Sequence, residues 1–104
     1  MKIVINGISG KMGSFVYEYF KNIDEYKIAG GISRKVSLFD IPIYQNIESC
    51  MDNTEFDVLI DFSLYPFCLV AVKAALQKGI NVVSGTTGYK KQDVKNLADL
   101  AKNN

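Results

Sequence analysis

The sequence predicts an α/β domain with an open, mostly parallel sheet and helices on both of its faces. Three observations predict it. Short β-prone runs alternate with helical patterns along the chain, and three spaced glycines separate the first strand from the first helix. Residues 56–62 form a continuous β-prone run typical of a strand buried on both faces of a parallel sheet. The 104 residues suit a single domain spanning positions 1–104.

The first strand, expected at residues 2–6, leads directly into Gly7, Gly10 and Gly13. Gly7 allows a sharp turn, Gly10 leaves room for a phosphate against the backbone, and Gly13 lets the next helix pack closely on the sheet. The free N–H groups and the dipole at the start of that helix favour a pyrophosphate. A strand before the glycines and a helix after them are the context of a dinucleotide site, so we expect a Rossmann-like fold.

The first helix should pack on the sheet through apolar residues at helical spacing, namely Met12, Phe15, Val16, Tyr19 and Phe20. A second strand is expected at residues 27–32. Because crossovers between parallel strands are right-handed, this strand should lie beside the first, with the glycine loop at the carboxyl ends of both.

Ser33, Arg34 and Lys35 follow the second strand, where related folds usually carry an acid that binds the ribose of the cofactor. Without an acid, this position does not repel a 2′-phosphate, and a guanidinium could pair with it. This favours NADPH, or use of both cofactors, over strict NADH. The alternative is that the two cations only solvate a loop.

The pattern is weaker over residues 36–54, where we expect a short extended piece near Pro42 and a short helix at 47–51. The clear strand at 56–62 follows. Ser63 could cap the next helix, which would hold Pro66 in its first turn and end at Gly79.

A further strand is expected at residues 80–84 and a last helix after Gly88. That helix should share one apolar face formed by Val94, Leu97, Ala98 and Ala101. The parallel topology gathers four loops at one edge of the sheet, where such folds bind ligands. These are residues 7–13, 33–34, 62–63 and 85–88.

Composition limits the possible partners. The chain has 12 Lys and Arg against 11 Asp and Glu, a net charge of +1, which does not favour nucleic acid or anionic membranes. No apolar stretch is long enough to cross a membrane and no secretory signal is expected, so we anticipate a cytoplasmic protein with a small-molecule partner. Cys50 and Cys68 are expected to be packing residues. The absence of histidine removes the commonest general acid and metal ligand, and no metal site is expected.

The loop after residue 84 could hold a flat ring. Gly85 and Gly88 free the backbone for close approach, and Thr86 and Thr87 offer hydroxyl and N–H groups to a carboxamide or carboxylate. The alternative is an ordinary strand-to-helix turn with threonine caps. Phe62 could pack beside a cofactor or belong to the core.

Three motifs in this order resemble the amino-terminal domain of dihydrodipicolinate reductase over essentially the whole chain. They are Gly7-Ile8-Ser9-Gly10-Lys11-Met12-Gly13, Ile60-Asp61-Phe62-Ser63 and Ser84-Gly85-Thr86-Thr87-Gly88-Tyr89. That family reduces a cyclic intermediate of the lysine pathway to tetrahydrodipicolinate with hydride from NADPH or NADH.

The resemblance implies a set of cofactor-binding residues and no catalytic residue in this chain. Residues Gly7, Ile8, Ser9, Gly10, Lys11 and Met12 would wrap the pyrophosphate, Arg34 would meet a 2′-phosphate, and Phe62, Gly85, Thr86 and Thr87 would lie at the nicotinamide. The family's proton donor and substrate-binding groups belong to a second domain, whose motifs are absent here. The full-length family is homotetrameric. Ser33 departs from the acid often found at its position.

Two alternatives stay open at this point. One is the cofactor domain of another NAD(P)-dependent dehydrogenase, of the aspartate or homoserine type, against which the Gly-Thr-Thr-Gly loop argues. The other is a stand-alone nucleotide-sensing module, which the missing catalytic residues would suit. The leading interpretation is a cofactor domain that is inactive by itself as a reductase.

Overall fold

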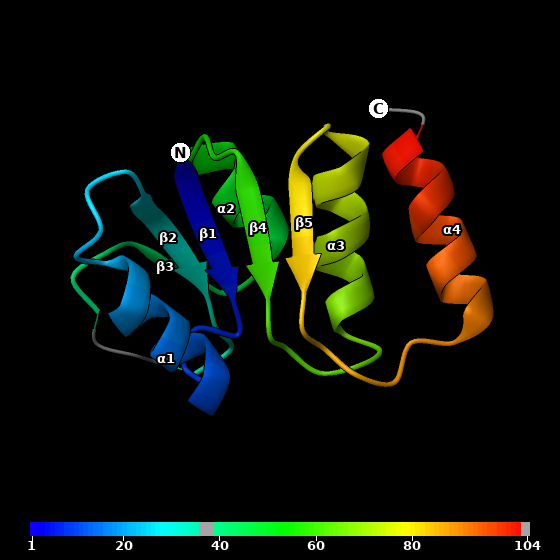
Figure 1. Cartoon of the computed structure of the whole chain (residues 1–104), viewed down its shortest axis with the longest axis horizontal. Coiled ribbons are helices and arrows are strands. Elements are labelled where there is room, and N and C mark those ends of the chain that lie inside the picture. The colour runs from blue at the N-terminus through cyan, green and yellow to red at the C-terminus, as the bar shows by residue number, and fades with distance from the viewer. Residues whose placement is uncertain (36–38, 103–104) are drawn as a thin grey trace.

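The computed structural model describes residues 1–35 and 39–102, and its five strands form one parallel sheet in the order β3-β2-β1-β4-β5 (Figure 1). Part of the weakly patterned segment, residues 36–38, lies outside the described residues, as do 103–104. The strands are β1 (Lys2–Asn6), β2 (Lys27–Ile32), β3 (Ile43–Tyr44), β4 (Val58–Asp61) and β5 (Asn81–Ser84). The predicted Rossmann-like class is therefore confirmed, with β1 at the centre and all pairs parallel.

Helices cover both faces of the sheet. Helix α1 (Lys11–Phe20) lies on one face, over β1 and β2, while α2 (Ile47–Asn53) and α3 (Cys68–Gln77) lie on the other (Figure 1). Helix α4 (Lys91–Lys102) packs beside α3 and has no buried residue. None of the helices within residues 1–35 and 39–102 is long and apolar enough to cross a membrane.

Alternating side chains of the central strands fill two cores. Ile3 and Ile5 of β1 point toward α1, whereas Val4 points toward α2 and α3. Cys50 and Cys68 are free and fully buried, as expected of packing residues. Burial raises the pKa of the Cys50 thiol to about 11, so it stays neutral at physiological pH.

The predicted contact face of α1 is partly wrong. Met12, Phe15 and Tyr19 are exposed, at 51%, 65% and 62%. Val16 and Phe20 of the predicted face do pack against the core, and the buried residues of the helix are Gly13 and Tyr17. Gly13 has no side chain, so the helix lies very close to the glycine loop at this position. The face of the helix that contains Gly13 is therefore turned toward the sheet, and the face that contains Met12 is turned outward.

Two other helix predictions need correction. Helix α3 begins at Cys68, two residues after Pro66, and Ser63 does not cap it, because the N-cap position is Phe67. The Ser63 hydroxyl donates to Asp61 and accepts from Asn6 Nδ2 instead. In α4 only Leu97 of the predicted apolar face packs against the core. Val94 of the same face is 56% exposed.

Candidate functional site

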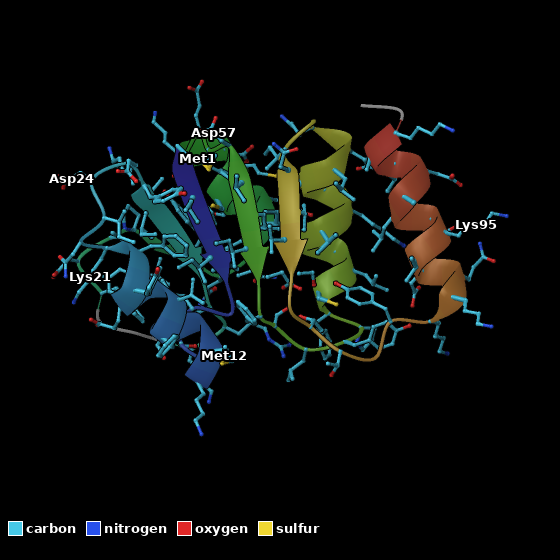
Figure 2. All side chains as sticks on the ribbon, in the orientation of Figure 1. Met1, Met12, Lys21, Asp24, Asp57 and Lys95 are labelled. Carbon is cyan, nitrogen blue, oxygen red and sulfur yellow. The ribbon has the colours of Figure 1, made fainter. Side chains whose placement is uncertain are left out.

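A cavity of about 640 Å³ lies at the carboxyl edge of the sheet, where all four loops meet as the topology predicts. The amino ends of the strands lie at the opposite edge, where Asp57 and Met1 stand in Figure 2, whereas Met12 lies at the start of α1 on the cavity side. The lining of the cavity includes Gly7, Ser9, Gly10, Lys11, Met12, Arg34, Phe62, Gly85, Thr86 and Thr87.

The glycine loop has the geometry of an anion cradle. Gly7 adopts a positive φ of 80°, and Gly10 N–H donates to Gly7 O at 3.0 Å. A Cβ on Gly13 would overlap Gly7 O, so the close approach of α1 depends on this glycine. A Cβ on Gly10 would meet only Gly7 O, at 3.3 Å, among the described atoms beyond its chain neighbours. The space in front of Gly10 is therefore open to a ligand rather than filled by protein.

The start of α1 supplies free donors at this space. The first bond of the helix runs from Ser14 N to Gly10 O at 2.9 Å, so the N–H groups of residues 11–13 have no partner within the helix. Gly10, Lys11 and Met12 all line the cavity. Together with the positive end of the helix dipole, these donors fit a doubly charged pyrophosphate.

Ser33 joins the end of β2 to the glycine loop. It is 4% exposed, its hydroxyl oxygen lies 2.6 Å from that of Ser9, and it accepts the Lys35 N–H at 3.1 Å. Arg34 and Lys35 line the same end of the cavity. Lys11 also lines the cavity, so the described lining residues include three cationic side chains and no carboxylate.

Asp61, to which the sequence analysis gives no role, connects the loops around the cavity. It is fully buried at the end of β4, and both of its oxygens accept hydrogen bonds. On one side Asn6 Nδ2 donates at 3.0 Å and the Ser63 hydroxyl at 2.7 Å. On the other side the hydroxyls of Ser84 and Thr86 donate at 2.9 and 2.7 Å. One carboxylate thus ties the ends of β1, β4 and β5 to the loop of Thr86.

Asp61→Asn should destabilise the domain by about 2 kcal/mol or more, because the new amide places a donor among groups that all donate to the carboxylate. Urea unfolding of the two proteins measures the change. Asp57→Asn is the matched control: Asp57 is exposed at the other edge of the sheet and accepts one backbone bond, from Lys2 N–H at 2.8 Å. The control should cost less than about 1 kcal/mol. Equal losses in both variants would contradict the role given to Asp61.

The Gly85–Gly88 loop is fixed by packing as well as by Asp61. A Cβ on Gly85 would overlap the ring of Phe62, so the loop lies directly on that ring. Phe62 is half-buried and both packs against the core and lines the cavity, so the two interpretations of this residue are compatible.

The far end of this loop is held by α4. Asp93 accepts the Lys90 N–H at 2.9 Å and the Tyr65 hydroxyl at 2.7 Å. These two bonds, the first being the stronger influence, lower the pKa of Asp93. The start of α4 is thereby tied to the loop that follows β4.

The structure brings together every predicted site residue except Ile8. The Ile8 side chain is fully buried in the core, and its N–H donates to Ile32 O at 3.3 Å. Leu64, Phe67 and Val70 also line the cavity, although their sequence pattern gives no sign of it. Phe67 and Val70 belong to an apolar run that is typical of a buried helix, and Leu64 stands alone in the loop after β4.

The parallel topology, the glycine cradle and the cavity at the strand ends define a Rossmann-like nucleotide-binding domain. A family model described as "Dihydrodipicolinate reductase, N-terminus" matches residues 1–104. The chain therefore belongs to the dihydrodipicolinate reductase amino-terminal family.

Curated relatives agree with this assignment. The 4-hydroxy-tetrahydrodipicolinate reductase of Caldanaerobacter subterraneus subsp. tengcongensis is 30% identical over 98% of this chain and 40% of the relative. That of Dehalococcoides mccartyi is 29% identical over the whole chain and 43% of the relative. The chain thus spans about two-fifths of these reductases.

Solved structures share the fold. A dipicolinate-bound dihydrodipicolinate reductase from Paenisporosarcina sp. TG-14 superposes with a TM-score of 0.87 at 20% identity, covering 96% of this chain and 42% of that one. A homoserine dehydrogenase from S. aureus gives 0.81 at 16% identity, covering 99% and 30%. Likeness at such identities shows the fold alone, so the family match favours the reductase over the homoserine-type alternative.

Proposed function

We propose that this chain is the NAD(P)H-binding domain of a dihydrodipicolinate reductase and that NADPH binds at least as tightly as NADH. The observation that carries the proposal is the cavity lining, in which Lys11, Arg34 and Lys35 face the space and the described residues contribute no carboxylate. NADPH brings a pyrophosphate and a 2′-phosphate, and such a lining suits both.

Each part of the cavity has a proposed task. The free N–H groups after Gly10 bind the pyrophosphate, and Arg34 pairs with the 2′-phosphate. Thr86 and Thr87 hold the carboxamide of the nicotinamide, and Phe62 packs at the ring and excludes water from it. When bound, the reduced nicotinamide supplies a hydride.

The complete enzyme, in this proposal, reduces the cyclic intermediate of lysine (diaminopimelate) biosynthesis to tetrahydrodipicolinate in the cytoplasm, as a homotetramer. The proton donor and the substrate-binding groups would come from the three-fifths of the reductases that this chain does not span. The present chain would bind cofactor without turnover. Calorimetric titration with NADPH and NADH at matched salt tests the proposal. A much lower dissociation constant for NADH than for NADPH, or no binding of either, would overturn it.

Ser33→Asp should reverse the cofactor preference. The new carboxylate can accept from the Ser9 hydroxyl and the Lys35 N–H, while the bond from the Ser33 hydroxyl to Lys35 O is lost. It also adds a negative charge next to Arg34, the residue proposed to pair with the 2′-phosphate. A carboxylate about 4 Å from a dianion is repelled by about 2 kcal/mol even in bulk water, so NADPH should weaken roughly tenfold or more while NADH does not. Ser33→Asn, of equal size and no charge, should leave the ratio of the two dissociation constants near that of the unmodified protein. The same change in ratio with both variants would contradict this assignment.

A further inference from the structure

The segment between β4 and α3 contributes a group of exposed apolar side chains to the cavity lining. Leu64, Phe67 and Val70 are 68%, 58% and 62% exposed, and all three line the cavity. They come from the loop after β4 and the start of α3. Single exposed apolar side chains are ordinary, but several gathered on one wall of a cavity mark a place for an apolar part of a ligand.

The side chain of Arg34 reaches this wall. It comes from the end of β2, and its Cζ lies 4.4 Å from the centre of the Phe67 ring, within the range of a cation–π contact. The guanidinium is planar and therefore stacks well on flat rings. The backbone of Phe67 lies at the entry to α3, and the side chains of both residues are exposed. The long side chain of Arg34 can therefore rotate away from the ring.

We propose that the adenine of the cofactor inserts between the Arg34 guanidinium and the Phe67 ring, so that Phe67 is a positioning residue for the base. This inference rests on the proposed function. An inserted base needs about 7 Å between the two planes, roughly two stacking distances, and the present 4.4 Å separation can widen by rotation of Arg34 alone. One cation–π contact is then replaced by two stacked contacts, and Arg34 remains beside the 2′-phosphate.

The order of the strands supports this placement. Across the sheet, the end of β2 carries Arg34, the end of β1 carries the glycine loop, and the ends of β4 and β5 carry Phe62 and Gly85–Thr87. A dinucleotide whose pyrophosphate lies on the central glycine loop has its two rings on opposite sides of it. With the nicotinamide at β4 and β5, the adenine falls on the side of Arg34.

Phe67→Ala should weaken the binding of NADPH and of adenosine 2′,5′-bisphosphate by about tenfold or more in calorimetric titrations, because it removes a stacking surface for the base. Phe67→Tyr keeps the ring and should restore both affinities. Phe15→Ala is the matched control: Phe15 is 65% exposed on α1, outside the cavity lining, and its removal should change neither affinity. Circular dichroism confirms that each variant is folded.

A second readout does not depend on affinity. In NMR spectra of the bound bisphosphate, the adenine H2 and H8 protons should shift upfield through the Phe67 ring current, and this shift should vanish in Phe67→Ala and persist in Phe67→Tyr. Unchanged affinity and unchanged shifts in Phe67→Ala would overturn the inference while leaving the proposed function intact. A failure of the unmodified protein to bind NADPH would overturn the proposed function itself.

Discussion

Gly10→Val should abolish binding of NADPH while the domain still folds. Among the described atoms beyond its chain neighbours, a Cβ at this position would meet only Gly7 O, at 3.3 Å, so the glycine loop can keep its conformation. The backbone of Gly10, at φ −75° and ψ 171°, is one that valine readily adopts. The two added methyl groups occupy the space in front of the N–H groups of residues 11–13, where the pyrophosphate must lie. We expect affinity to fall by about a hundredfold or more, equivalent to about 2.7 kcal/mol.

Calorimetry with NADPH measures this loss, and circular dichroism with urea unfolding verifies the fold. Ser14→Ala is a suitable control, because Ser14 belongs to the same helix and its hydroxyl donates to Gly10 O without lining the cavity. That control should retain binding. Full affinity in Gly10→Val would contradict the placement of the pyrophosphate.

Gly13→Ala should have the opposite signature and destabilise the fold itself. The added Cβ would overlap Gly7 O and press on Ile8 Cα at 2.9 Å, both of them backbone atoms that cannot rotate away. Alanine is favoured over glycine inside a helix by about 1 kcal/mol, yet overpacking against backbone outweighs this, and we expect a net loss of about 2 kcal/mol or more.

Urea unfolding of Gly13→Ala and Gly10→Ala compares the same chemical change three residues apart. Because the Cβ at position 10 meets one atom at 3.3 Å, the second variant should lose less than about 1 kcal/mol. Equal stability of the two variants would show that Gly13 does not set the distance between α1 and the loop.

The parts of the fold that follow local pattern were predictable from the sequence. Strands β1, β2, β4 and β5 lie where the β-prone runs predicted, and the four loops meet at one edge because parallel connection forces them to. The contact face of α1 was not predictable in the same way. Apolar residues lie on most sides of this helix, so the sequence does not show which side faces the sheet. The tertiary contact of Gly13 with Gly7 decides this.

The role of Asp61 could not be predicted from the sequence, again because it depends on tertiary contacts. Asp61 collects its partners from Asn6, 55 positions earlier, and from Thr86, 25 positions later. No short motif contains such a network. Phe67 likewise reads as part of a buried run, and only its contact with Arg34 across the cavity marks it as a surface for a ligand.

A crystal structure of this chain with NADPH would test the central claim most directly. We expect the pyrophosphate to lie within hydrogen-bond distance of the N–H groups that follow Gly10, at the start of α1. A pyrophosphate bound elsewhere in the molecule, under conditions in which calorimetry shows saturation, would contradict the account.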